Sequence, residues 1–245
     1  MQSLLRIENL HVSAGDKDIL KGIDLEIRQG ETHVLMGPNG AGKSTLGHAI
    51  MKDPKYEVKE GNIFFEEEDI TEESTDKRAR RGIFLSFQDP IAVPGISLGN
   101  FVRSALEQGG REHIRLWDYK KKVKSICELL NMNEAYTERD LNVGFSGGEK
   151  KKAEIFQLLM LNPKLAILDE TDSGLDVDAV KTVSEGVREF QKNGGTLLII
   201  THSTRILDNL QVDKTHILYD GKIIKTDGPE LVSQINEKGF EEYIA

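Results

Sequence analysis

The chain is poor in cysteine, proline and tryptophan, with one, six and one of these residues among 245. With Cys127 alone, no disulfide can form within the chain, and no site built from four thiolates can exist in it. Cys127 lies at helical apolar spacing, which predicts a buried core thiol. No apolar run approaches the roughly 18–20 residues that a membrane-spanning helix needs. We therefore expect a protein that is not inserted in a membrane.

The chain also lacks an excess of positive charge. It has 32 Lys and Arg residues against 41 Asp and Glu residues, a formal net charge of −9. Because cationic contacts to phosphates dominate nucleic-acid binding, this balance argues against nucleic acid as the main partner. Residues 1–6 lack the charged and apolar blocks of a signal peptide, so we expect a cytoplasmic location.

Short apolar segments alternate with helical patterns along the chain. Strands are expected at residues 5–12, 19–27, 32–36, 63–65, 82–87, 164–168, 196–200, 215–219 and 222–225. Helices are expected at residues 76–81, 98–106, 117–130, 148–161 and 176–191, with loops at 90–94 and at Gly109-Gly110. Such alternation indicates an α/β fold with a parallel sheet covered on both faces. We expect a core from residues 1–88 and 163–245, with antiparallel strands near its start, and an inserted helical subdomain at 89–162.

One glycine-rich segment matches the phosphate-binding pattern G-x-x-x-x-G-K-[ST], and it lies between an expected strand and an expected helix. Glycines let the backbone N–H groups approach an anion closely, and the start of the helix adds unpaired N–H groups. A lysine in this position reaches the outer phosphates of a nucleotide, and the following hydroxyl is placed to bind Mg²⁺. The segment consists of Gly37, Pro38, Asn39, Gly40, Ala41, Gly42, Lys43, Ser44 and Thr45. It predicts a site for a nucleoside triphosphate and Mg²⁺.

Two carboxylates follow the buried strand at residues 164–168. Ligands bind at the carboxyl ends of strands in open α/β sheets, so Asp169 should lie beside the phosphate-binding loop and support the Mg²⁺ held by Ser44. We expect Glu170 to orient or deprotonate an attacking water.

A second anion-binding device is predicted where Ser146, Gly147, Gly148 and Glu149 begin a helix. One nucleotide does not need two such devices from one chain. The segment therefore serves a nucleotide bound to another subunit, or it is an ordinary helix cap.

The order of these motifs resembles that of the ABC-type ATPases over nearly the whole chain. The resemblance includes Gln88, the segment from Ser173 to Asp176, and Thr201-His202. It implies a P-loop NTPase core in which Gln88 senses Mg²⁺ and the water, and His202 contacts the γ-phosphate. It also implies that Ser146–Glu149 faces the ATP of a partner subunit and that Asp176 bridges the two sites.

Three residues make the resemblance narrower. Glu149 stands where transporter ATPases typically have Gln, and Thr171-Asp172 stands where they have Pro-Thr. In these features the chain is similar to the SufC-type ATPases of the Suf iron–sulfur cluster assembly machinery. This likeness implies SufB- and SufD-like partners and an ATP-dependent homodimer of the ATPase subunit that rearranges them. The alternatives are the ATPase subunit of a membrane ABC transporter and a scaffold that binds nucleotide without hydrolysing it.

Further expectations concern the surroundings of the site. Ala14 stands where an aromatic residue often stacks on adenine in this family, so base stacking should be weak. We expect one lysine of residues 150–152 to pair with the cluster of Asp169, Glu170 and Asp172, and to hold Glu170 away from water. We expect residues 87–97 to contact the partner protein.

Overall fold

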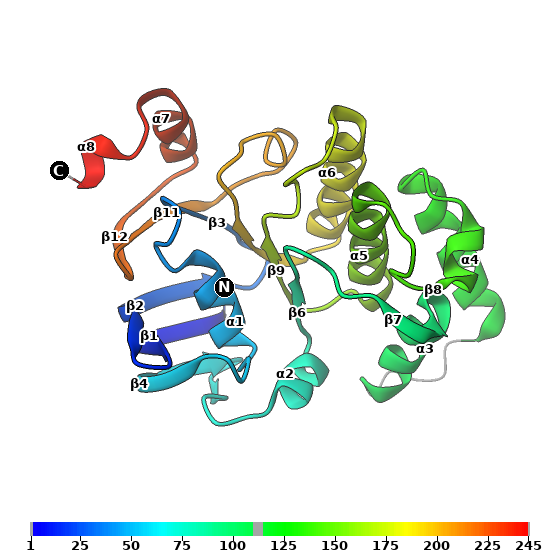
Figure 1. Cartoon of the computed structure of the whole chain (residues 1–245), viewed down its shortest axis with the longest axis horizontal. Helices are drawn as coiled ribbons and strands as arrows, with labels where there is room; N and C mark the ends of the chain where they lie inside the picture. Colours follow the sequence, from blue (N-terminus) through cyan, green and yellow to red (C-terminus); the bar gives the residue numbers. More distant parts are fainter. Residues whose placement is uncertain (1, 110–114, 245) are drawn as a thin grey trace.

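The computed structural model describes residues 2–109 and 115–244, and its centre is a six-stranded sheet (Figure 1). The strand order is β12-β11-β3-β10-β9-β6, parallel except for the β11–β12 hairpin. The strands are β3 (Thr32–Met36), β6 (Ile83–Ser86), β9 (Leu165–Asp169), β10 (Thr196–Ile200), β11 (Lys214–Tyr219) and β12 (Lys222–Asp227). The predicted parallel sheet is thus confirmed, as is the hairpin.

A second, antiparallel sheet has the order β2-β1-β4-β5. It contains β1 (Ser3–Ala14), β2 (Lys17–Arg28), β4 (Glu57–Phe65) and β5 (Glu68–Asp69). Figure 1 shows this sheet on one side of the molecule and the helices α3, α4 and α5 on the other, with β6 and β9 between them.

The helices are α1 (Lys43–Ile50), α2 (Thr75–Arg81), α3 (Leu98–Gln108), α4 (Leu116–Leu129), α5 (Gly147–Leu161), α6 (Val177–Lys192), α7 (Glu230–Lys238) and α8 (Glu241–Ile244), with a 3₁₀ turn η1 (Glu134–Glu138). Within residues 2–109 and 115–244, none of them has the length and apolar character that crossing a bilayer demands. Helices α7 and α8 were not anticipated from the sequence. Of the loop expected at Gly109-Gly110, Gly110 lies outside the described residues.

The expected loop at residues 90–94 was wrong at its C-terminal end. Strand β7 (Val93–Ser97) begins there and pairs with β8 (Asp140–Leu141). The paired segments are more than forty residues apart in the chain, and Pro94 and Gly95 are typical of a turn. No local pattern could therefore have revealed this pairing.

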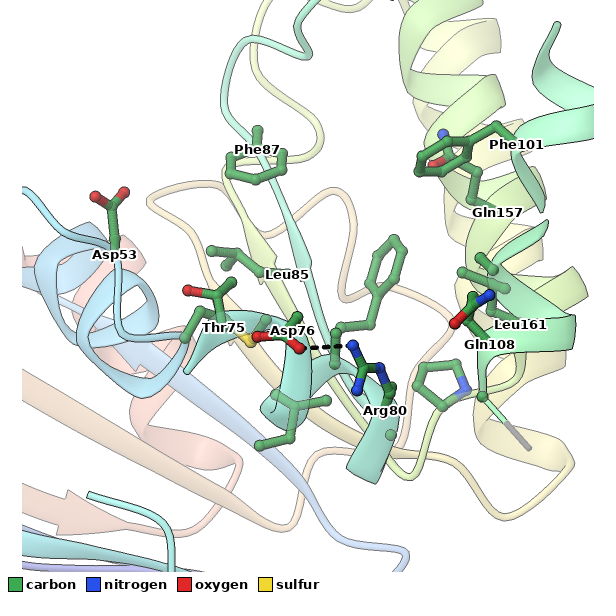
Figure 2. A pocket seen from close by; sticks show the side chains of 18 of the residues that line it. Asp53, Thr75, Asp76, Arg80, Leu85, Phe87, Phe101, Gln108, Gln157 and Leu161 are labelled. Atoms are coloured by element: carbon green, nitrogen blue, oxygen red, sulfur yellow. Dashed lines mark hydrogen bonds and ion pairs between the residues drawn. The ribbon is translucent and has the colours of Figure 1, made fainter. Parts of the chain in front are cut away.

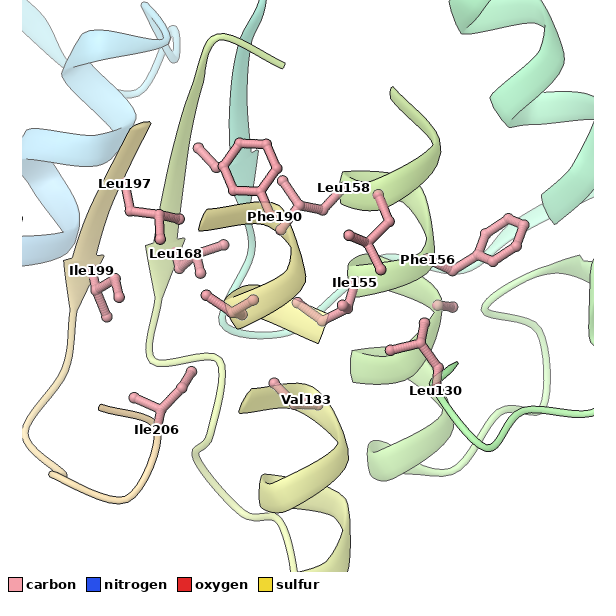
Figure 3. Close-up of a cluster of buried hydrophobic side chains, with 14 of the residues drawn as sticks. Leu130, Ile155, Phe156, Leu158, Leu168, Val183, Phe190, Leu197, Ile199 and Ile206 are labelled. Atoms are coloured by element: carbon pink, nitrogen blue, oxygen red, sulfur yellow. The ribbon is translucent and has the colours of Figure 1, made fainter. Parts of the chain in front are cut away.

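Alternate residues of the central strands face opposite sides of the sheet. Leu197 and Ile199 of β10 belong to the cluster packed against α5 and α6 (Figure 3). Leu198 and Ile200 belong to the opposite cluster, which includes Leu46 of α1 and the antiparallel sheet. Both faces of the sheet are covered, which explains why its strands are apolar at nearly every position.

Candidate nucleotide-binding and hydrolysis site

The predicted phosphate-binding loop (residues 37–45) connects the end of β3 to the start of α1. A Cβ atom on Gly37 would lie 2.1 Å from the carbonyl oxygen of Leu218, so only glycine lets the loop pass β11 this closely. Gly42 is the residue before α1, and its φ of 107° favours glycine. The loop thus has the backbone that an anion-binding strand-to-helix turn requires.

Lys43 is buried within this loop. Its Nζ donates hydrogen bonds to the carbonyl oxygens of Gly37 (2.8 Å) and Pro38 (3.1 Å). Burial lowers the pKa of Lys43, and the nearby carboxylates of Glu170 and Asp169 oppose this shift. The ammonium group is therefore held against the loop, where it can neutralise a phosphate group.

Asp169 ends β9 beside Ser44 and is almost fully buried. Burial raises the pKa of its carboxyl group, the side chain of Ser44 lowers it, and the charge of Glu170 raises it further. Its Oδ1 atom is buried and has no hydrogen-bond partner. An orphaned carboxylate oxygen beside a hydroxyl fits a hard divalent cation such as Mg²⁺. No cluster of three or more His, Cys, Asp and Glu residues that could hold a metal occurs in the described chain, so such a cation would need phosphate and water oxygens as well.

The predicted residues Gln88, Glu170 and His202 lie together. Gln88 Nε2 donates a hydrogen bond to Glu170 Oε2 (2.8 Å), and His202 Nδ1 lies 3.3 Å from Glu170 Oε1. Glu170 has a φ of 46°, a conformation that is uncommon outside glycine, asparagine and aspartate, and its N–H donates to the carbonyl oxygen of Ile200. Both carboxylate oxygens are thus engaged by side chains from two other parts of the chain.

The expected lysine partner of the acidic cluster was wrong. Lys150 lies 3.3 Å from Asp89, Lys151 pairs with Glu154, and Lys152 donates to the carbonyl oxygen of Asn131.

Three further contacts around the acidic cluster were missed. Asp172 instead accepts a hydrogen bond from Thr201 Oγ1 (3.3 Å). The hydroxyls of Ser86 and Thr171 lie 3.0 Å apart, and Ser86 Oγ also accepts from the N–H of Asp169. Each contact joins segments at least 29 residues apart, so the sequence carried no local signal for them.

The turn at residues 146–149 begins α5 with a complete capping box. Ser146 Oγ accepts from the N–H of Glu149, and a Glu149 oxygen accepts from the N–H of Ser146. The Tyr136 hydroxyl donates to the other Glu149 oxygen, and this contact lowers the pKa of Glu149. The guanidinium group of Arg139 lies over the ring of Tyr136. Glu149 therefore has structural partners that a glutamine could not match equally.

The structure does not bring this turn to the phosphate-binding loop of the same chain. Figure 1 shows α1 and α5 on opposite sides of β6 and β9. Asp176 caps α6 by accepting from the N–H of Ala179 (2.8 Å) and is exposed.

A cavity of about 660 Å³ lies beside the site, lined mostly by apolar side chains (Figure 2). The end of α1, α2, β6, α3 and α5 all contribute to it. Within residues 87–97, the segment expected to contact a partner, Phe87 lines the cavity, and this residue is 45% exposed. Nothing in the sequence pattern indicated a cavity here, because its walls come from distant segments.

The fold, the phosphate-binding loop and the acidic end of β9 together define an ATP-binding cassette. The family model described as ABC transporter matches residues 20–173, and the chain belongs to this family. Its members are ATP-hydrolysing cassettes, which makes the chain an ATPase that binds ATP and ADP.

Particular relatives are similar over almost their full length. The probable ATP-dependent transporter SufC of Escherichia coli is 43% identical over 97% of each chain. Vegetative protein 296 of Bacillus subtilis is 44% identical, covering 98% of this chain and 92% of that protein. A probable ABC transporter ATP-binding protein of Streptococcus pyogenes serotype M3 is 46% identical, covering 97% and 94%. The solved ADP conformation of MJ1267, an ATP-binding cassette of an ABC transporter, superposes with a TM-score of 0.78 at 27% identity over the whole of both chains.

Proposed function

We propose that this chain is the cytoplasmic ATPase subunit of a Suf-type iron–sulfur cluster assembly complex. Two copies dimerise on ATP and thereby rearrange SufB- and SufD-like partners. The observation that carries this proposal is the 43% identity to SufC over 97% of both chains, together with Thr171 and Asp172 next to Glu170 and Glu149 in the second anion-binding turn. All three side chains have hydrogen-bond partners within the fold.

The proposed dimer is supported by the separation, within one chain, of the phosphate-binding loop and the turn at residues 146–149. The turn at residues 146–149 lies apart from the phosphate-binding loop of its own chain (Figure 1). Its capping box uses the N–H groups of Ser146 and Glu149 and leaves those of Gly147 and Gly148 for a nucleotide on another copy. A γ-phosphate between the two copies contacts both of them. Hydrolysis removes that differential contact, so ATP favours the closed dimer and ADP the open one.

Hydrolysis uses positioning and charge neutralisation more than covalent chemistry. Lys43 supplies positive charge at the outer phosphates, and His202 contacts the γ-phosphate. Glu170 accepts a proton from the attacking water or orients it, and Gln88 holds the carboxylate in place. Bound Mg²⁺, held by Ser44, Asp169 and the side-chain oxygen of Gln88, would neutralise charge on the phosphates.

We assign the cavity beside Phe87 to the SufB- or SufD-like partner. Its lining is mostly apolar and includes Phe87, which directly precedes Gln88 in the chain. A partner side chain inserted here would contact the loop that carries Gln88.

A transporter ATPase is the second candidate, favoured by the 46% identity to the probable ABC transporter ATP-binding protein of S. pyogenes. Co-purification from native lysate, with and without ATP, separates the two. SufB- and SufD-like proteins in the eluate support the cluster-assembly function, whereas a membrane-embedded permease in their place would establish the transporter.

Replacing Glu170 by Gln tests the catalytic role. The amide cannot accept the proton, so we expect kcat to fall by about 100-fold or more, while ATP still binds. Size-exclusion chromatography with ATP should then show a stable dimer that wild type loses on turnover. The exposed Glu237 on α7 provides a matched control, because Glu237→Gln makes the same change of charge at a position away from the site. Normal hydrolysis by Glu170→Gln would remove Glu170 from this role.

A further inference from the structure

The peptide backbone of Phe87 is held on both sides by two side chains of α5. Its N–H donates to Glu154 Oε1 (2.8 Å), and its carbonyl oxygen accepts from Lys151 Nζ (2.5 Å). Lys151 Nζ also donates to Glu154 Oε2 (3.0 Å), which closes a ring of three hydrogen bonds. We call Lys151 and Glu154 the α5 pair.

The α5 pair is buried, with both side chains 5% exposed. A buried ion pair stabilises a fold poorly unless its remaining donors and acceptors are also satisfied. Here the peptide group of Phe87 satisfies them. Burial raises the pKa of Glu154, and the charge of Lys151 opposes that shift.

The loop after β6 is otherwise exposed at this point. Phe87, Gln88 and Asp89 are all exposed, and Lys150 reaches Asp89 at 3.3 Å. The α5 pair therefore provides the buried attachment of the loop immediately before Gln88. The next residue along, Gln88, donates to Glu170 Oε2.

The same helix begins with the turn at residues 146–149, one turn before Lys151. A rotation of α5 thus moves the Phe87 peptide, and the side chain of Gln88 moves relative to Glu170. We propose that the α5 pair is a positioning device that sets Gln88 against the Glu170 carboxylate, coupling the orientation of α5 to hydrolysis. This inference rests on the roles proposed above for Gln88 and Glu170.

The experiment first compares four forms of the full-length chain in steady-state ATPase assays, before two single variants are added. The four forms are wild type, the double variant Lys151→Met/Glu154→Leu, Gln88→Ala, and the triple variant that combines all three changes. Replacing both members of the pair leaves no unpaired buried charge, so the double variant should fold. Circular dichroism and the unfolding midpoint check that it does.

We expect the double variant to lose about tenfold in kcat, because a displaced positioning group costs rate, with KM for ATP within about twofold because the phosphate-binding loop is untouched. The triple variant should be no slower than Gln88→Ala, since the pair acts through Gln88. The single variant Glu154→Gln keeps an acceptor for the Phe87 N–H and should retain most of the wild-type kcat. Lys152→Met, on the same helix but bonded to Asn131, is the matched control and should match wild type.

Two results would overturn the coupling alone: a fully active double variant, or a triple variant whose losses multiply. Unchanged hydrolysis by Gln88→Ala would instead refute the role of Gln88 in the proposed function, and the coupling with it. An inactive wild type would refute the ATPase site as a whole.

Discussion

Arg78 of α2 is fully buried and links α2 to the helix that follows the phosphate-binding loop. Its guanidinium group donates to five carbonyl oxygens. Nη1 reaches Ala49 (3.1 Å) and Ile50 (2.7 Å) at the end of α1, while Nη2 and Nε reach Ile70 (2.7 Å), Thr71 (2.7 Å) and Glu73 (3.0 Å). Burial lowers the pKa of Arg78 to about 10, which leaves it charged at neutral pH. The positive charge also lies at the C-terminal end of α1, where the helix dipole favours it.

Replacing Arg78 by Met removes all five donors while keeping much of the side-chain volume. A buried acceptor left without a donor costs about 1–3 kcal/mol. The oxygens of Ala49, Ile70 and Thr71 each keep a second donor. The loss of unfolding free energy is therefore well below five times the cost of one unsatisfied acceptor. We expect Arg78→Met to lower the free energy of unfolding by about 3 kcal/mol.

Urea unfolding followed by circular dichroism measures this change. Arg80→Met is the matched control on the same helix, because Arg80 is exposed and forms an ion pair with the equally exposed Asp76. Its unfolding midpoint should be indistinguishable from wild type. A loss below about 1 kcal/mol for Arg78→Met would refute the idea that these hydrogen bonds hold α1 in place.

Two other predictions follow from contacts between distant strands. Gly37→Ala should weaken ATP binding by about tenfold or more, measured with a fluorescent ATP analogue, because its Cβ would lie 2.1 Å from the Leu218 oxygen. Gly30 also has a positive φ, but open space surrounds the position of its Cβ, so Gly30→Ala should bind ATP normally. Equal affinities of the two variants would contradict the argument. Burial lowers the pKa of His216 to about 3, below the roughly 6.5 of a histidine in the unfolded chain. The contribution of His216 to the free energy of unfolding is therefore fully present above pH 6.5 and is lost as the pH drops toward 3. Between pH 7.5 and 5.5, His216→Gln should lose about 1.4 kcal/mol less unfolding free energy than wild type. Thr226→Val, which keeps the histidine and removes its hydroxyl partner, should lose as much as wild type; identical slopes for all three proteins would refute the assignment.

The sequence predicted features that depend on near neighbours in the chain. The bounds of β3 and β10 match the expected strands to the residue, because both strands are buried on two faces and apolar throughout. The phosphate-binding loop was equally visible, since its glycines, lysine and hydroxyl lie within nine residues between a strand and a helix. The family followed from the order of such local motifs.

Only the tertiary structure decided which distant groups touch. Gln88 and His202 reach Glu170 from 82 and 32 residues away, and their meeting was predicted only through the resemblance. One lysine of residues 150–152 was expected to pair with the acidic cluster of Asp169, Glu170 and Asp172, but the fold directs Lys151, for example, to Glu154 and the backbone of Phe87. The pairing of β7 with β8 likewise joins segments that are distant in the chain. In any compact fold, a lysine has several carboxylates within its reach. Packing and burial decide which of them becomes its partner, and no local pattern of residues encodes these.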